Sequence, residues 1–253
     1  MENLLDLVDK RTLTTVVVKQ DVRFNLSIMT QKQLLLIILF SIASVRVLTA
    51  QSLNFVGRGN LSIGAEYQSI DYNGGDLFYS PGGGIGVELG LQLDIVKGFA
   101  IQSTLGYQLH LALQAESVNG VSNKSSFNFN RKFISLGVLK NFKLTDKTVN
   151  SLQVGTGASI NFPGTLKRTE NDNELGESSY HSNFGLYFEL ALRLKLSDKV
   201  YLDPAIRYRR LNFSAESYSN GPITDLPDYL QDLNSNGIEL GITFVKKLKS
   251  SKR

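Results

Sequence analysis

The 253-residue sequence has no cysteine, only five prolines, two histidines and no apolar run long enough for a transmembrane helix. Without cysteine the chain has neither a disulfide framework nor a thiolate metal site. The formal net charge of +4 is small, and no cluster of Lys and Arg alternates with aromatic residues. A nucleic-acid partner is therefore not expected, because a stacking platform needs basic and aromatic residues side by side.

One N-terminal segment indicates the compartment. Residues 29–50 (MTQKQLLLIILFSIASVRVLTA) combine a basic start, an apolar run over 34–45 and small residues before a cut near Ala50. This pattern is typical of a secretory signal peptide. A single transmembrane anchor is the alternative, but the run is well short of the ~20 residues that a spanning helix needs. Residues 1–28 carry no pattern and are interpreted as a non-native extension before a start at Met29.

The stretch GGGIGVELGLQLDI, residues 82–95, has an aliphatic residue at every odd position from Ile85 to Ile95. Its even positions are Gly, Glu, Gln or Asp. A side-chain period of two predicts a β-strand, because successive Cβ atoms point to opposite faces. The same alternation recurs and gives eight predicted strands, at 53–70, 82–95, 99–113, 127–142, 152–162, 183–196, 200–209 and 237–244.

Two of these strands are irregular. In 127–142 the aromatic residues up to Phe133 share one parity, whereas the aliphatic residues from Ile134 share the other. A β-bulge near Phe133 would reconcile them, because one extra residue reverses the facing of all that follow. Pro204 cannot donate a hydrogen bond to a ladder, so a bulge or weak point is predicted in 200–209.

The connections alternate in length. Those around 95–98, 145–148 and 197–199 are short, whereas DYNGGDLFYSPG, QAESVNGVSNKSS, PGTLKRTENDNELGESSYH and SAESYSNGPITDLPDYLQDLNSN are long and polar. Transmembrane barrels have short periplasmic turns and longer extracellular loops. The predicted fold is therefore all-β: an eight-stranded antiparallel up-and-down transmembrane β-barrel over 51–248, followed by a basic tail at 249–253. A soluble lipocalin-like barrel is the alternative.

The polar parity of these strands predicts the content of the lumen. A sheet in hydrocarbon must close on itself, and eight strands leave an interior that side chains can fill. Acids and bases are balanced on this parity, so a paired network is expected, with glycines making room for the long side chains. The predicted charge network consists of Arg58, Glu66, Glu88, Glu189, Arg193, Arg207, Arg209 and Glu239.

The apolar parity predicts a surface that faces lipid. Lys or Arg at the bilayer midplane would cost ~2–4 kcal/mol, and we expect neither on this surface. Aromatic residues near the strand ends are predicted to form interfacial girdles. They are Phe55, Tyr67, Phe99, Phe127, Phe142, Phe162, Phe184, Tyr208 and Phe244.

These features resemble the small eight-stranded outer-membrane β-barrel proteins of Gram-negative bacteria, including the PorT-like family. The likeness covers roughly residues 51–248 and depends on the signal peptide ending in AQ, on GGGIGVELGLQLDI and on the final GIELGITFVKKL. Here Phe244 is followed by a basic tail, which departs from the terminal aromatic residue of many such barrels. The resemblance implies an outer-membrane location and, commonly, no catalysis.

The sequence offers two candidate sites, a pair of histidines and a calcium-like run. Parity places His110 and His181 on the lumen side, away from the lipid-exposed rim that a lipid-modifying enzyme would need, so no catalytic residue or cofactor is expected. Asp232 begins a run with the spacing of a calcium loop, but its twelfth position is Thr243 and not Glu. Asn236 before Gly237 is more simply a turn, and no metal site is expected.

The long loops are acidic, with eleven Asp and Glu residues against three Lys and Arg residues. Solvated loops explain this charge; divalent-cation bridging to lipopolysaccharide, or docking of a cationic ligand or envelope protein, is the functional hypothesis. We expect a monomeric barrel that is structural, surface-binding or secretion-associated and makes contact with outer-membrane lipid. A narrow passive channel and a lipid-A-modifying enzyme are the alternatives.

Overall fold

The computed structural model describes residues 52–65, 68–72, 75–95, 97–118, 121–144, 149–170 and 173–250. The expected extension 1–28, the signal peptide 29–50, Glu66 and Tyr67 lie outside these residues. Within the described residues no helix is long and apolar enough to cross a membrane.

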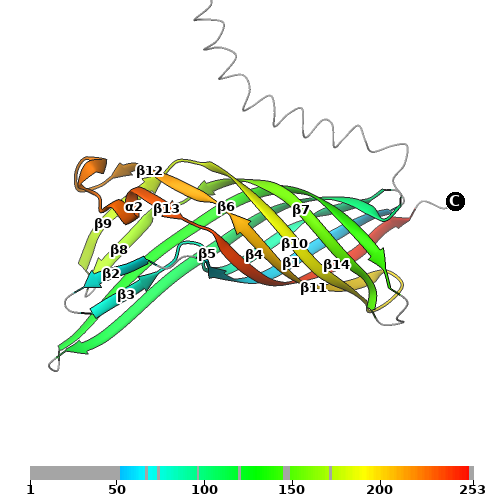
Figure 1. Cartoon of the computed structure of the whole chain (residues 1–253), viewed down its shortest axis with the longest axis horizontal. Helices are drawn as coiled ribbons and strands as arrows, with labels where there is room; N and C mark the ends of the chain where they lie inside the picture. The colour runs from blue at the N-terminus through cyan, green and yellow to red at the C-terminus, as the bar shows by residue number, and fades with distance from the viewer. Residues whose placement is uncertain are drawn as a thin grey trace, which may run out of the picture. The chain divides into compact units, whose positions relative to one another are not determined.

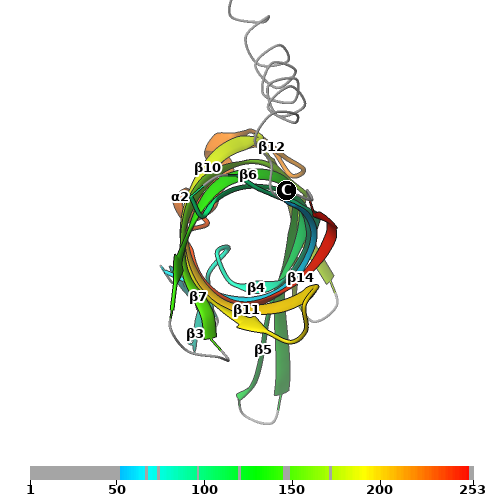
Figure 2. The same ribbon diagram turned by 90° about the vertical axis from the view of Figure 1, so that its right-hand side faces the viewer.

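Eight strands form a closed antiparallel barrel, which Figure 2 shows as a ring seen along its axis. Each strand pairs with the next in the chain, and the last pairs with the first, which closes the cylinder. The up-and-down barrel predicted from the alternation is confirmed. Its strands are β1 (Ser52–Gly64), β4 (Gly84–Asp94), β5 (Phe99–Val118), β6 (Val121–Lys143), β7 (Val149–Pro163), β10 (Asn183–Lys195), β11 (Val200–Arg210) and β14 (Gly237–Ser250).

Both ends of the barrel chain lie at the end with the short connections. Ser52 pairs with Ser250 on one side and with Asp94 on the other. The β10–β11 turn lies at this end too, since Lys247 donates its backbone N–H to the carbonyl of Lys199. We call it the turn end, and the opposite end the loop end. The strand β14 continues to Ser250 and so includes the first residues of the predicted tail.

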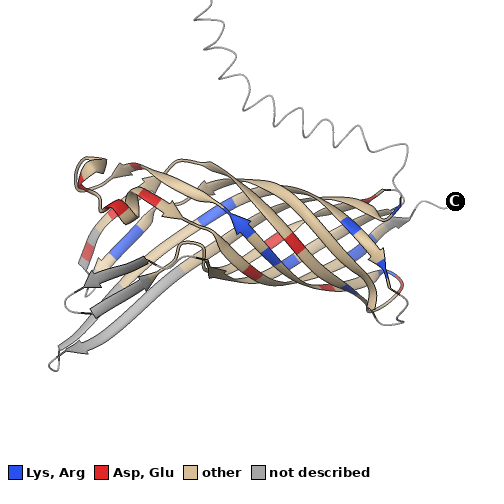
Figure 3. Cartoon of the chain, viewed as in Figure 1, with Lys and Arg blue, Asp and Glu red and all other residues tan. Residues whose placement is uncertain are grey.

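Burial alternates along the strands with the inverse of a soluble pattern. In β10, the outward Leu186 and Leu190 are 55% and 39% exposed. On the other face of the same strand, Glu189 and Arg193 are only 5% and 6% exposed. The outside is therefore aliphatic and the inside polar and charged, as predicted. Figure 3 shows charged positions lying along the barrel strands, and those toward the middle of the strands, such as Glu189 and Arg207, are buried inside.

The bulge predicted near Phe133 is wrong. Partners in β5 and β6 keep one register from Phe99↔Lys140 to Val118↔Val121 without a shift. Phe127, Phe129 and Phe133 are all buried, so this strand carries aromatic residues on its inner face. The parity changes at this point because the inner face is apolar toward the loop end, not because an extra residue is inserted.

This correction moves charged residues to the outer face. With no bulge, Lys132 and Lys140 have the outward parity of Val138, and Lys132 is exposed. Arg210 and Lys246 are also exposed and outward, at the ends of their strands. The expectation of no Lys or Arg on this surface is therefore wrong at the strand ends, where a long side chain can reach the polar interface.

The predicted girdle is partly confirmed. Six of its aromatic side chains are at least 40% exposed: Phe99, Phe142, Phe162, Phe184, Tyr208 and Phe244. Phe55 is half-buried. Phe127 is 7% exposed and belongs to an interior cluster described below, so its place in the girdle was wrong.

Pro204 produces no bulge. It pairs with Ile242 in a β11–β14 ladder that keeps one register throughout. The ladder to β10 is interrupted beside the proline: residues pair at Ala191↔Ala205 and again, in the same register, at Leu194↔Leu202. The missing N–H of proline therefore marks the weak point that was predicted as an alternative.

The long connections are folded, contrary to the expectation of loops (Figure 1). The first predicted strand ends at Gly64 and is followed by a separate hairpin, β2 (Gln68–Tyr72) and β3 (Gly75–Tyr79). Beyond the barrel, β6 pairs with β8, and the sheet continues through β9 and β12 to β13. These elements are β8 (Leu166–Glu170), β9 (Asn173–Tyr180), β12 (Asn212–Tyr218), η1 (Ile223–Asp225), α2 (Asp228–Gln231) and β13 (Asp232–Asn234).

Candidate functional site: the charged lumen and the apolar cap

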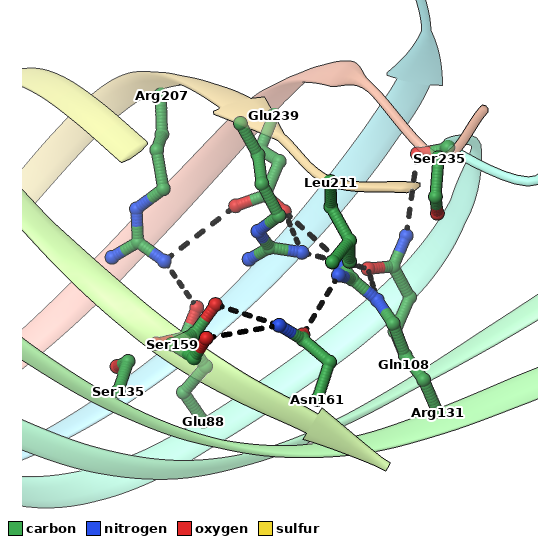
Figure 4. Close-up of polar contacts among 12 residues, drawn as sticks. Glu88, Gln108, Arg131, Ser135, Ser159, Asn161, Arg207, Leu211, Ser235 and Glu239 are labelled. Atoms are coloured by element: carbon green, nitrogen blue, oxygen red, sulfur yellow. Dashed lines mark hydrogen bonds and ion pairs between the residues drawn. The ribbon is translucent and has the colours of Figure 1, made fainter. Parts of the chain in front are cut away.

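Arg207 on β11 lies at the centre of the lumen. Its Nη1 is 2.7 Å from Oε1 of Glu88 on β4, and its Nη2 is 2.8 Å from Oε2 of Glu189 on β10. Glu239 on β14 contributes a third carboxylate, 3.6 Å from Nη1. Figure 4 shows Arg207, Glu88 and Glu239 pointing toward one another from different strands. The guanidinium of Arg207 thus contacts carboxylates on three strands, β4, β10 and β14, and β4 is not a neighbour of the other two in the sheet.

Three further arginines complete this layer. Arg58 on β1 pairs with Glu189, and its guanidinium lies over the backbone of Gly241. Arg209 places Nη1 2.6 Å from Oε1 of Glu239. Only glycine leaves room at position 241, because a Cβ there would lie 2.6 Å from Nε of Arg58. The expectation that glycines accommodate arginine is confirmed at this position.

Arg131 on β6 joins the same layer from the opposite wall. It donates from Nε to Oε1 of Gln108 at 3.0 Å and from Nη1 to Oδ1 of Asn161 at 3.1 Å. Its Nη2 lies 3.6 Å from Glu239. Figure 4 shows Arg131 beside Gln108 and Asn161.

A second ionic group lies toward the turn end. Arg193 donates from Nη2 to Oδ2 of Asp203 at 2.7 Å and from Nε to Oδ1 at 3.1 Å. The same Nη2 lies 3.3 Å from Oε1 of Gln92. Near the last residues of β4, Asp94 accepts hydrogen bonds from Asn54 and Ser52. The inner face is therefore polar along the barrel, not in a single ring.

Seven of the eight predicted lumen charges are buried and brought into ion pairs, while Glu66 lies outside the described residues. Sequence reasoning missed Arg131 and Asp203. Arg131 was missed because the supposed bulge obscured its parity. Asp203 has the inward parity of Arg207 and could have been found from that alone.

Aromatic rings occupy the remaining lumen space. The Phe133 ring lies 5.2 Å from Cζ of Arg131 and 4.9 Å from Cζ of Arg209, and it covers Gly106. The Tyr187 ring lies 4.4 Å from Cζ of Arg207. Cations over aromatic faces gain attraction when both are withdrawn from water. Phe133 therefore stabilises Arg131 and Arg209, and Tyr187 stabilises Arg207.

A turn at residues 80–83, which we call the mouth turn, enters the loop end of the barrel. Figure 2 shows the cyan segment before β4 inside the ring of strands. All four residues are buried. Gln108 donates to the carbonyl of Gly83 at 3.0 Å, and Ser235 donates to the carbonyl of Pro81 at 2.8 Å. These bonds fix the turn above the layer of arginines.

Above the mouth turn lies an apolar cluster, which we call the apolar cap. Its aromatic members touch edge to face, with Phe129 5.9 Å from Tyr180 and 5.8 Å from Phe213 between ring centroids. The Tyr180 hydroxyl donates to the carbonyl of Leu230 at 2.9 Å. The cap consists of Tyr79, Phe127, Phe129, Leu166, Tyr180, Leu211, Phe213, Leu226, Leu230 and Leu233.

The cap gives the outer elements a hydrophobic core of their own. Five of its members are fully buried at 0% exposure, which is the opposite of the exposed aliphatic belt on the barrel. Burial raises the pKa of Tyr180 and of Tyr79, because an ionised phenolate would lose its hydration there. These elements therefore pack around a buried apolar core, as a water-soluble domain does. The barrel beneath them instead exposes its aliphatic residues.

The two histidines differ in placement. His110 is buried beside the mouth turn, with its ring 4.9 Å from that of Tyr79. His181 is exposed between β9 and β10, with Nδ1 3.9 Å from Glu216. Its predicted place in the lumen is wrong, because the alternation of β10 begins only at Asn183.

The oxygen atoms of the calcium-like run do not converge. Asp232 accepts a hydrogen bond from Ser214, Asn234 accepts from the backbone of Asn236, and Asn236 accepts from the backbone of Leu211. Within the described residues there is no group of three or more metal-ligating side chains. The run instead forms β13 and the turn into β14.

Comparison with protein-family models found no match, and neither did comparison with curated proteins. Among solved structures, the outer membrane protein OprG from Pseudomonas aeruginosa is 13% identical with a TM-score of 0.48, covering 80% of this chain and 98% of that one. Neisserial surface protein A is 12% identical with a TM-score of 0.42, covering 78% and 97%. The outer membrane protein AlkL is 14% identical with a TM-score of 0.45, covering 82% and 95%.

The geometry of the chain itself places the barrel in a membrane. Water does not stabilise a cylinder with an aliphatic exterior and an ionic interior, whereas hydrocarbon requires a closed sheet with this facing. Apolar residues cover the outer face of β10 from Phe184 to Leu194. This length fits the ~9–11 residues of a tilted transmembrane strand. The chain therefore has the closed sheet and the facing of a membrane-spanning β-barrel of the outer-membrane type.

Proposed function

We propose that this barrel is a non-conducting outer-membrane anchor that presents a folded, ligand-binding module at the cell surface. The observation that carries the proposal is the position of Arg207 among Glu88, Glu189 and Glu239, at 2.7–3.6 Å. An eight-stranded barrel has room for side chains but not for side chains and a water column. The mouth turn and the apolar cap lie above this layer and support the same conclusion.

Planar-bilayer recording tests the closed lumen. The refolded chain is expected to give no steady single-channel conductance. A narrow passive channel, the alternative, predicts discrete ohmic steps. The double variant Glu88→Ala with Arg207→Ala removes a central ion pair without leaving either partner unpaired, and is expected to raise conductance if the network is the barrier. Steady conductance by the parent chain would reject the proposal.

The surface module is the ligand-binding part in this proposal. Its exposed acidic residues include Glu174, Glu216, Asp225, Asp228 and Asp232. They would bind cationic groups, including divalent cations that bridge to lipopolysaccharide phosphates. Binding of the parent chain to lipopolysaccharide vesicles is expected to fall on chelation of divalent cations and in a Glu174→Gln, Glu216→Gln variant. Unchanged binding in both cases would count against the acidic surface.

We further propose that the chain is monomeric and not catalytic. Closure of β14 on β1 leaves no barrel edge to pair with a second copy. His110 is enclosed beside Tyr79, which leaves it no access to lipid, and His181 lies 3.9 Å from the exposed Glu216 outside the barrel strands. An altered lipid-A mass spectrum on expression, lost in His181→Ala, would instead support the enzyme alternative.

Membership of the PorT-like group is part of the same proposal. It is supported by the glycine-rich alternation of residues 82–95 and by the final strand GIELGITFVKKL. Both segments form adjacent neighbours of β1, as β4 and β14. A secretion defect on deletion of the chain, restored by the parent sequence, would support a secretion-associated role over a purely structural one.

A further inference from the structure

The turn end of the barrel is strongly basic. Its described lysines line the short turns and the last residues of the strands that reach them, and Figure 3 shows blue positions at this end. The exposed Asp198 pairs with Lys195 at 2.8 Å, so these two cancel. Six further lysines at this end whose side chains the structure describes, which we call the basic collar, are Lys97, Lys140, Lys143, Lys199, Lys246 and Lys247.

The basic collar is unpaired within the part of the chain that the structure describes. None of its ammonium groups makes an ion pair with a described carboxylate. The one close polar contact joins Nζ of Lys140 to the backbone carbonyl of Lys97 at 2.6 Å. A carbonyl leaves the positive charge uncompensated. Uncompensated like charges gathered at one end of the barrel favour an external anion.

Two members of the collar have the parity that faces lipid. Lys140 continues the outward series of Val138, and its Nζ lies 4.1 Å from the centroid of the Phe99 ring. Lys246 follows Phe244 on the outward face of β14 and pairs with Val200. The exposed rings of Phe99, Phe142 and Phe244 belong to the interfacial girdle at this end. Lys140 and Lys246 therefore lie at the depth of lipid headgroups.

We propose that the basic collar binds the phosphate groups of anionic phospholipids in the leaflet next to the short turns. The inference rests on the membrane placement argued above and adds a lipid preference to it. Short turns of outer-membrane barrels face the periplasm, so this leaflet is the inner one. Lysines near an anionic surface attract its lipids, and this attraction weakens as salt rises.

A lipid fits this surface better than an acidic soluble protein does. A periplasmic protein would reach the end of the cylinder, where Lys143 and Lys247 have the lumen-facing parity. It would not reach Lys140 beside Phe99, which is on the side of the cylinder. The chain thus offers two matched pairs of lysines with the same charge but different facing.

The test uses full-length chain refolded into phosphatidylcholine vesicles, with spin-labelled phosphatidylglycerol and phosphatidylcholine as probes. Electron paramagnetic resonance gives the relative association of the two lipids with the barrel. We expect roughly threefold preference for phosphatidylglycerol, reduced by high salt. The Lys140→Gln, Lys246→Gln variant should lose about half of it or more, whereas Lys143→Gln, Lys247→Gln should keep most of it.

Two outcomes would overturn the proposal: no preference in the parent chain, or equal loss in both double variants. Equal loss would mean that net charge alone is sensed, as an acidic partner at the end of the barrel would sense it. Each variant is checked for flotation with vesicles and for heat-modifiable gel migration. A parent chain that fails these checks contradicts the membrane barrel itself; a folded chain without preference contradicts only the lipid site.

Discussion

Arg207 on β11 donates across the lumen to Glu88 on β4 at 2.7 Å, over a wall in which β1 and β14 separate the two strands. The bond therefore joins parts of the cylinder that share no backbone ladder. Both residues are 1% exposed, so neither ion has water as a substitute partner. A charge buried this deeply is stable only with its partner present.

Glu88→Gln is expected to lower the free energy of unfolding by about 3 kcal/mol, because it leaves Arg207 with less negative charge in a buried site. Denaturant titration of the refolded chain in detergent micelles measures this change. Asp198→Asn is the control, since it removes an exposed pair at the turn end and should not shift the midpoint. Equal midpoints for the parent chain and Glu88→Gln would contradict a structural role for the network.

The exterior makes a separate prediction. Leu190 faces outward on β10, between Phe188 and Leu192, and is expected to lie in hydrocarbon. Leu190→Arg should reduce the free energy of folding into vesicles by ~2–4 kcal/mol. Lys132→Arg is the matched control, because Lys132 has the same facing near the loop end and already carries a charge. A soluble barrel would tolerate Leu190→Arg and fail to float with vesicles.

Two glycines, one on β5 and one on β1, test how tightly the lumen is packed. Gly106 faces inward beneath the Phe133 ring, whereas a Cβ at Gly59 would meet no atom within 4 Å. Gly106→Ala is expected to cost about 1–3 kcal/mol through displacement of the ring, while Gly59→Ala should be nearly neutral. Thermal gel-shift midpoints compare the two variants. Partial rescue of Gly106→Ala by Phe133→Leu would identify the ring as the cause.

Much of the barrel is predictable because two solvents act on alternate residues. Along the middle of β4 and β10 the facing of each residue follows from parity, and seven predicted lumen charges across the barrel are buried for the same reason. Parity gives neither distance nor pairing. That Arg207 serves Glu88, Glu189 and Glu239 together depends on strand tilt and stagger, which no local pattern contains.

The outer elements were less predictable for a physical reason. Above the membrane the inside of the sheet is apolar, so Phe127 and Phe129 reverse the rule that holds below them. The inner face of β6 includes polar residues within the barrel and is apolar toward the loop end, and the strand keeps one register across this change. A parity argument that assumes a polar inner face along the whole strand needs a bulge at this point. That assumption produced the wrong bulge at Phe133 and left Arg131 out of the predicted lumen network.

The apolar cap should be separable from the barrel. Phe213 is fully buried and touches Phe129, and Phe213→Ala is expected to destabilise the cap by about 3–5 kcal/mol. Because the barrel ladders do not depend on this ring, the variant should still show heat-modifiable migration. Limited proteolysis of intact cells should cut it between β8 and α2 faster than the parent. Loss of the barrel itself would show that cap and cylinder fold as one unit.

Buried tyrosines make the cap sensitive to alkali. Burial raises the pKa of Tyr180 and of Tyr79 above the value of about 10 in an unfolded chain. The folded cap therefore keeps both phenols protonated, whereas the opened cap releases protons as the pH passes about 10. Linkage then gives full stability below that pH and a loss as pH rises toward the folded values. Phenolate absorbance and proteolysis, followed together, should show tyrosine ionisation coinciding with cap opening while the barrel stays intact. In Tyr180→Phe, which lacks one titrating group, the loss between about pH 10 and 12 should be shallower, and an unchanged alkaline loss would exclude Tyr180 as its source.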